Sequence, residues 1–173
     1  LSKAKNLNEA KVRQMAKTIY KNGKTLLSLI QEIIEIYKIS SGKVQSDLKA
    51  IGAHQLLSDL SEVLSPLYQA KKQQVSFQSE DFSFLSDHQR MSRILTNLIS
   101  NAIKYTPEKG KIQVEAKMEK GRVVFKVEDN GMGIDPDERQ DLFLPFRRGK
   151  KAYLTEEGTG LGLFVTSELV RVL

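Results

Sequence analysis

The segment from Val127 to Ile134 most strongly limits what this chain can fold into. It reads Val-Glu-Asp-Asn-Gly-Met-Gly-Ile and follows a run that alternates apolar and polar residues, as a strand does. Asp129 places a carboxylate at the expected strand end, and Gly131 and Gly133 leave backbone that a flat ring such as adenine can approach closely. Asp-Asn-Gly is also a common turn sequence, so the segment alone predicts either a turn or a ring-binding site.

A row of polar side chains is expected on one face of a helix upstream of this segment. Asn97, Asn101 and Lys104 stand at positions i, i+4 and i+7, which lie on one stripe of a helix. Two amides and an ammonium on a packed helix gain nothing unless a polar group faces them, so the stripe predicts a binding site. Asn97 is expected to contact the ligand or support Asn101, with simple exposure to solvent as the alternative. Tyr105, at the end of the stripe, is explained equally well as a site residue or a core residue.

A glycine-rich segment precedes a final apolar stretch with helical spacing, residues 164–173. A turn of this kind that leads into a helix presents unpaired N–H groups and the positive end of the helix dipole. It therefore predicts a phosphate site. The residues are Gly158, Thr159, Gly160, Leu161 and Gly162.

Four short motifs thus follow one another along the chain: Asn97–Tyr105, Asp129–Ile134, Leu142–Arg148 and Gly158–Leu163. In this order they resemble the N, G1, F and G2 boxes of sensor histidine kinases, which share an ATPase superfamily with gyrase, Hsp90 and MutL. The resemblance covers roughly residues 48–173. It implies an α+β fold, a two-layer α/β sandwich of the Bergerat ATP-binding type.

The resemblance also implies roles for individual residues. Asp129 would accept a hydrogen bond from the adenine amino group, which favours ATP over GTP. Asn101 would offer its amide oxygen to Mg²⁺, and Lys104 would reach a phosphate as a point charge. The other residues implied to bind ATP are Asn97, Tyr105, Gly131, Gly133, Ile134, Gly158, Thr159, Gly160, Leu161 and Gly162.

Residues 135–157 are expected to form a mobile lid over the site. Their charged, glycine-containing sequence cannot bury much apolar surface. Phe143 and Phe146 are expected to anchor the lid, and simple core packing is the alternative, which is compatible with that role. By the resemblance, Arg148, and with less support Arg147, would neutralise the γ-phosphate, whereas a solvated basic loop is the alternative reading of the same residues.

The N-terminal part of the chain predicts one long helix over residues 9–39. Apolar residues recur every seven positions, at Val12, Ile19, Leu26 and Ile33. The stripe needs partners, because an exposed large apolar side chain forfeits about 1.5 to 3 kcal/mol of burial free energy. The resemblance supplies them: residues 1–43 resemble the second helix of the dimerisation and phosphotransfer hairpin, which pairs into a dimeric four-helix bundle.

Three parts are therefore expected. Residues 1–43 are the bundle helix, residues 44–53 are a hinge, and residues 54–173 are the ATP-binding catalytic domain without the C-terminal strands that relatives carry. Within the catalytic part, Asp87 is expected to cap a helix that ends before Pro107, and Pro66 is expected to kink a helix over residues 55–72 or break a turn of it. Strands are expected at 75–77, 82–85, 111–118 and 122–128, the last two as a hairpin.

Composition excludes several classes of protein. Forty per cent of the residues are apolar and 28% are charged, as in ordinary globular proteins, and cysteine is absent, which excludes disulfides. The net charge of +6 is spread along the chain, so nucleic acid is not expected as a partner. No apolar run approaches the roughly 20 residues of a membrane helix. The chain is expected to be soluble and cytoplasmic, without membrane contact of its own, while the parent protein can still be anchored.

The function expected from the resemblance is that of an ATP-dependent protein-histidine kinase, acting as a homodimer with a response-regulator receiver domain as partner. His54 and His88 are the only histidines, and neither has the acidic residue, arginine and proline that follow the family's phosphoacceptor. The phosphoacceptor is therefore expected upstream of a fragment. Two alternatives stay open: a kinase-like, nucleotide-sensing scaffold, and a clamp-type ATPase, for which an obvious acidic base near Asn101 is missing.

Overall fold

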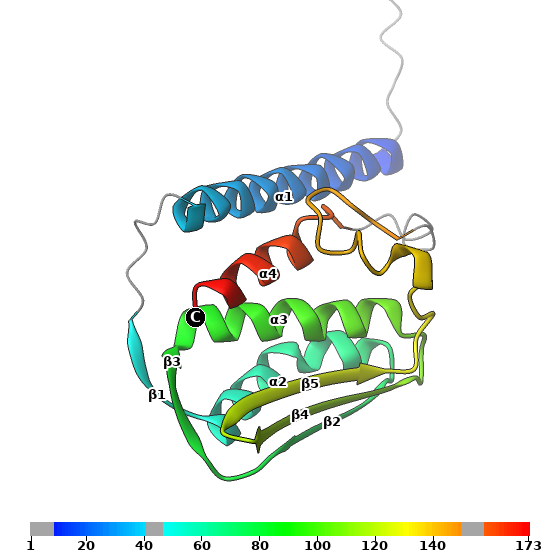
Figure 1. Ribbon diagram of the computed structural model, residues 1–173. Helices are drawn as coiled ribbons and strands as arrows, with labels where there is room; N and C mark the ends of the chain where they lie inside the picture. The colour runs from blue at the N-terminus through cyan, green and yellow to red at the C-terminus, as the bar shows by residue number, and fades with distance from the viewer. Residues whose placement is uncertain (1–8, 41–46, 150–157) are drawn as a thin grey trace, which may run out of the picture.

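The computed structural model describes residues 9–40, 47–149 and 158–173. In Figure 1, helices α2, α3 and α4 lie on one side of a sheet, and the long helix α1 crosses over α4 on the side away from the sheet. The helices are α1 (Glu9–Ser40), α2 (Ala53–Ala70), α3 (His88–Tyr105), the short 3₁₀ helix η1 (Pro136–Glu138) and α4 (Gly162–Arg171). The strands are β1 (Leu48–Gly52), β2 (Gln74–Ser79), β3 (Ser83–Asp87), β4 (Lys111–Glu119) and β5 (Arg122–Asp129).

The larger sheet has the order β2-β4-β5, with β2 parallel and β5 antiparallel to β4. The expected hairpin of β4 and β5 is confirmed, with Val114 opposite Val127. Strand β4 alternates between exposed and buried positions, and its inward residues Ile112, Val114 and Ala116 are at most 1% exposed. A separate antiparallel pair, β1 and β3, leads into the two central helices.

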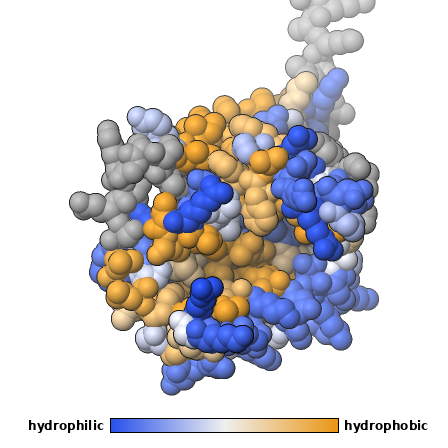
Figure 2. Space-filling view, in the orientation of Figure 1, coloured by the Kyte–Doolittle hydropathy of each residue, from blue (hydrophilic) through white to orange (hydrophobic). Residues whose placement is uncertain are grey.

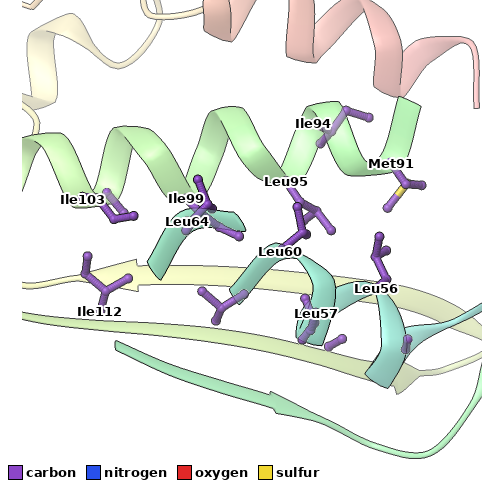
Figure 3. Packing of buried hydrophobic residues seen from close by; sticks show 14 of the residues in the cluster. Leu56, Leu57, Leu60, Leu64, Met91, Ile94, Leu95, Ile99, Ile103 and Ile112 are labelled. Carbon is purple, nitrogen blue, oxygen red and sulfur yellow. The ribbon is translucent and has the colours of Figure 1, made fainter. Parts of the chain in front are cut away.

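The core lies between the sheet and the helices α2 and α3 (Figure 3). Both helices carry apolar residues at helical spacing on the face that meets the strands. The expected two-layer α/β fold is confirmed by this arrangement. The labelled core residues are Leu56, Leu57, Leu60 and Leu64 of α2, Met91, Ile94, Leu95, Ile99 and Ile103 of α3, and Ile112 of β4.

Asp87 caps α3, as the sequence predicts. Its side chain accepts a hydrogen bond from the backbone N–H of Arg90 at 3.1 Å, and the guanidinium Nε of Arg90 lies 3.5 Å from the other carboxylate oxygen. Burial opposes ionisation, but the N–H groups of Arg90 and Asp47 and the charge of Arg90 together hold the pKa of Asp87 below its usual value. The cap thus fixes the start of the helix that carries the polar stripe.

Pro66 lies inside α2, which continues as helix to Ala70, so the expected broken turn is not found. The ring nitrogen of Pro66 cannot donate to the carbonyl of Glu62 four residues earlier. The hydroxyl of Ser65 donates to that same carbonyl at 2.9 Å and supplies the missing bond. The helix spans Ala53–Ala70 where residues 55–72 were expected, a shift of two residues at each end.

The long helix expected over residues 9–39 is confirmed as α1. Its apolar stripe is largely exposed in the single chain. Val12, Ile19, Leu26 and Ile33 are 48 to 72% exposed. Figure 2 shows hydrophobic side chains along the upper part of the molecule, where α1 crosses. Such a stripe is what a bundle helix presents to partner helices, although the dimer itself stays a prediction.

Two further expectations concern the N-terminal half. Of the predicted hinge, residues 44–46 lie outside the described residues, and Leu48–Gly52 forms β1, which pairs with β3; the hinge itself stays a prediction. Within residues 9–40, 47–149 and 158–173, no helix combines the length and the apolar character that a membrane crossing requires.

Candidate functional site

A cavity of about 890 Å³ opens between α1, the polar stripe of α3, the end of β5 and the glycine-rich segment before α4. Most residues that the sequence assigns to a site line it. These are Asn97, Asn101, Lys104, Tyr105, Asp129, Gly133, Ile134, Arg147, Arg148, Gly158, Thr159, Gly160 and Gly162. Gly131, Leu161, Phe143 and Phe146 are not among the lining residues.

One end of the cavity is built around the carboxylate of Asp129, the last residue of β5. Its Oδ1 accepts the backbone N–H of Gly131 at 2.8 Å and the hydroxyl of Thr106 at 3.4 Å. Both protein donors reach the same oxygen, so the second oxygen keeps its capacity to accept from a ligand. Thr106 is 1% exposed and follows α3 directly. No motif in the sequence marked Thr106, although its place directly after the polar stripe is a usable signal.

Gly131 is required by a close approach of backbone to backbone. A Cβ at this position would lie 2.5 Å from the carbonyl oxygen of Tyr105 and 2.7 Å from Oδ1 of Asp129. No side chain fits there without a shift of the backbone. The next residue, Met132, donates its N–H to the same Tyr105 carbonyl at 3.4 Å. The strand end is thereby attached to the end of α3.

The polar stripe of α3 faces the cavity as the sequence predicts, and Asn97 has a specific partner. Its amide Nδ2 donates to the hydroxyl of Thr166 on α4 at 2.8 Å, and a Cβ at Gly162 would lie 2.5 Å from its Oδ1. Asn101 and Lys104 are half-buried along the same stripe. The ammonium of Lys104 lies 4.8 Å from the centroid of the Tyr105 ring.

The C-terminal end of α3 is held by two side chains from the α2–β2 connection, which the sequence analysis did not single out. The ammonium of Lys71 donates to the carbonyls of Ile103, Lys104 and Thr106 at 2.8, 2.8 and 3.0 Å. The amide of the buried Gln73 also donates to the carbonyls of Ile103 and Thr106. The last carbonyls of a helix have no N–H donor within the helix, and these bonds supply donors to them. The charge of Lys71 also complements the negative end of the α3 dipole.

The opposite end of the cavity is the glycine-rich segment at the start of α4. The backbone N–H of Leu161, the N-cap residue of α4, donates to the hydroxyl of Thr159 at 3.2 Å. That hydroxyl in turn donates to the carboxylate of Glu32 on α1 at 2.8 Å. The predicted helix N-terminus is therefore present beside the cavity, together with an acidic residue that the sequence analysis did not place there.

The predicted lid is described only in part, because residues 150–157 lie outside the described residues. Its first half forms η1 and a series of turns, and Asp135 caps η1 by accepting the N–H of Asp137 at 3.1 Å. Phe143 and Phe146 are 50% and 63% exposed, so the alternative of simple core packing is not found, and their role as lid anchors stays a prediction. In this part of the chain Leu142 lines the cavity in their place.

Helix α1 supplies cavity residues that no local sequence pattern marked. These are Tyr20, Lys21, Lys24, Thr25, Ser28 and Glu32. Two lysines from this helix join Lys104, Arg147 and Arg148 around the cavity. The resulting excess of cationic side chains suits a polyanionic ligand.

The two-layer fold and a cavity rich in cationic side chains are typical of a domain that binds a polyanionic ligand. Residues 86–173 match the model of the histidine kinase-, DNA gyrase B-, and HSP90-like ATPase family. The chain belongs to this family. Within this family the chain is similar to the ATP-binding catalytic regions of sensor histidine kinases.

The chain is 33% identical over 168 residues to the circadian input-output histidine kinase CikA of Thermosynechococcus vestitus. The aligned residues cover 93% of this chain and 23% of that protein. It is 30% identical over 181 residues to the autoinducer 2 sensor kinase/phosphatase LuxQ of Vibrio vulnificus, covering 98% of this chain and 21% of that protein. The chain therefore spans less than a quarter of the length of these relatives.

Two solved structures share the fold. Full-length ShkA in complex with AMPPNP superposes with a TM-score of 0.79 at 28% identity, covering 92% of this chain and 33% of that one. The Acinetobacter baumannii histidine kinase AdeS superposes with a TM-score of 0.75 at 20% identity, covering 96% and 75%. CikA and LuxQ are named as kinases, so the two alternatives, a clamp-type ATPase and a kinase-like scaffold, are not favoured.

Proposed function

We propose that this chain binds Mg·ATP in the cavity and serves as the part of a histidine kinase that delivers the γ-phosphoryl group to a histidine. The observation that carries the proposal is the carboxylate of Asp129. Thr106 and Gly131 occupy its Oδ1, and its other oxygen can select an adenine amino group. The rest of the cavity leads from this carboxylate to the N-terminus of α4, where phosphates are stabilised.

The remaining residues divide between the phosphates and their metal. Lys104, Arg147 and Arg148 line the cavity as cations that neutralise phosphate charge. The amide oxygen of Asn101 is a hard ligand of the kind that Mg²⁺ accepts. Among the described residues no cluster of three or more histidine, cysteine or acidic side chains could hold a metal. The triphosphate would thus supply most of the ligands to Mg²⁺, with Asn101 as the protein's contribution.

The transfer itself needs positioning and charge neutralisation more than covalent chemistry. The bond between the γ-phosphorus and the bridging oxygen of ATP breaks, a bond forms from an imidazole nitrogen to phosphorus, ADP leaves, and the imidazole loses its proton. The phosphoryl group then passes to an aspartate of a receiver domain.

Neither histidine of this chain lies at the cavity: His54 lines a separate surface pocket, and His88 opens α3 at the end away from Lys104. The acceptor histidine therefore belongs to a segment outside this sequence. We place the bundle helix at residues 1–43, the hinge at 44–53 and the catalytic domain at 54–173, with dimerisation through α1, whose exposed apolar stripe supports this assignment.

Calorimetric titration with AMPPNP, with and without Mg²⁺, tests the nucleotide site. Asp129→Asn should reduce the affinity at least about tenfold, because a donor replaces part of the acceptor that faces the adenine amino group. Asp81→Asn is the matched control, since Asp81 is exposed between β2 and β3 and does not line the cavity. Equal affinity for the wild type and Asp129→Asn would refute the assignment. Transfer of labelled γ-phosphate to an added histidine-bearing bundle then tests the kinase step.

A further inference from the structure

Glu32 of α1 reaches across to the glycine-rich segment. Its Oε2 accepts the hydroxyl of Thr159 at 2.8 Å, and its Oε1 accepts the hydroxyl of Ser28, one turn earlier on α1, at 3.2 Å. Both oxygens of the carboxylate are thus engaged, and the side chain is half-buried against the cavity that it lines. This is a defined position for an acidic side chain inside a cavity otherwise rich in lysine and arginine.

The position of this carboxylate coincides with the place where a phosphate is expected. The hydroxyl of Thr159 accepts a hydrogen bond from the N–H of Leu161, the N-cap residue of α4, and donates one to the carboxylate of Glu32. The anion therefore lies one hydroxyl away from the positive end of the α4 dipole. A carboxylate and a phosphate oxygen are both acceptors that such a terminus stabilises, and both cannot use the Thr159 hydroxyl as donor at once.

We infer that Glu32 is an internal competitor for the nucleotide phosphates, so that docking of α1 on the glycine-rich segment and binding of the phosphates oppose each other. This inference rests on the proposed function of the cavity. A nucleotide must take the Thr159 hydroxyl from Glu32 and must accept the nearby negative charge or displace it. Lys21 and Lys24 of α1 also line the cavity, so α1 opposes the phosphates only at Glu32, through its negative charge and its hold on the Thr159 hydroxyl.

The competition makes nucleotide affinity depend on the position of α1. When α1 is held on the segment, the affinity for triphosphates is reduced. When a bundle partner or an upstream signal draws α1 away, Thr159 is released for the phosphates. By linkage, a bound triphosphate must weaken the docking of α1 by the same factor.

The test is a titration of the full chain and of Glu32→Gln with AMPPNP and, separately, with adenosine. Glutamine keeps the shape and the helix propensity of glutamate but removes the charge. We expect Glu32→Gln to bind AMPPNP about fivefold more tightly than the wild type, with adenosine affinity unchanged because adenosine carries no phosphate. Glu32→Ala should act in the same direction, which guards against an effect peculiar to the amide.

Glu9→Gln is the matched control, because it makes the same change near the start of the same helix, and Glu9 does not line the cavity. It should leave both affinities unchanged. An unchanged AMPPNP affinity in Glu32→Gln, alongside wild-type binding that depends on Asp129, would overturn the inference and leave the nucleotide site standing. A loss of affinity seen only with Mg²⁺ would also overturn it, because Glu32 would then be a metal ligand. Absence of AMPPNP binding in every variant would refute the proposed function itself.

Discussion

The amide nitrogen of Asn97 donates a 2.8 Å hydrogen bond to the hydroxyl of Thr166, which joins α3 to α4 beside the cavity. Thr166 is 6% exposed, so its replacement leaves a partly buried amide without this acceptor. We expect Thr166→Val to lower the free energy of unfolding by about 1 to 2 kcal/mol, as measured by urea denaturation. Thr18→Val, the same change at an exposed site on α1, should lower the free energy of unfolding by less than about 0.5 kcal/mol. Equal losses in the two variants would show that the bond between α3 and α4 adds no stability beyond that of an exposed threonine.

The buried cap at Asp87 predicts a loss of stability in acid. Because the pKa of Asp87 is lower in the folded than in the unfolded chain, its contribution is fully present above the unfolded pKa of about 3.9. It is lost as the pH falls through the folded pKa. Asp87→Ala should therefore lower the free energy of unfolding at pH 7, by about 1 to 3 kcal/mol, because the cap and the ion pair with Arg90 are both lost.

Denaturation at pH 7 and pH 3 checks this prediction. The difference between the wild type and Asp87→Ala should shrink at pH 3, where the wild-type carboxylate begins to protonate. Asp81→Asn, at an exposed position, serves as the control and should show no such convergence. A gap that stays constant across the two pH values would contradict the role given to the ionised cap.

Gly131→Ala should disrupt the adenine end of the site. The added Cβ would meet the Tyr105 carbonyl at 2.5 Å, so the segment must move and Asp129 loses one of its donors. We expect AMPPNP affinity to fall at least about tenfold in titrations. Gly23→Ala offers the contrasting control: a Cβ there meets nothing within 4 Å, and alanine should stabilise α1 by up to about 1 kcal/mol. Unchanged affinity in Gly131→Ala would show that the backbone approach is not needed for binding.

Lys71→Met should destabilise the end of α3 that carries Lys104 and Tyr105. Methionine fills similar space but leaves the three carbonyls that Lys71 now bonds with fewer donors. A loss of about 1 to 3 kcal/mol is expected in thermal or urea unfolding. Lys11→Met, at an exposed position on α1, should change the stability little. If the two variants unfold alike, the Lys71 cap is dispensable.

The parts of the fold that could be predicted from the sequence are those fixed by neighbours in the chain. Asp87 bonds an N–H three residues away, and the alternation of Ile112, Val114 and Ala116 follows from strand geometry. The same holds for the stripe of Asn97 and Asn101, whose spacing alone places both on one helix face.

The contacts that sequence reasoning missed join residues far apart in the chain. Thr106 bonds a carboxylate 23 positions away, Lys71 bonds carbonyls 32 to 35 positions away, and Glu32 meets a hydroxyl 127 positions away. No periodicity records such pairings. The exposure of Phe143 and Phe146 could not be predicted for a related reason, because an aromatic pair in a charged loop shows its size but not whether a core lies within reach.

The separation of 127 positions between Glu32 and Thr159 also orders events during synthesis of the protein. At about 5 to 20 residues per second, roughly 6 to 25 seconds pass between the addition of the first and the addition of the second. During that interval α1 exists without α4, and the wall of the cavity that Thr159 contributes has not been made. Nucleotide can therefore be enclosed only after the residues through Thr159 have been synthesised, so ATP cannot act as a template for the folding of the segments before it.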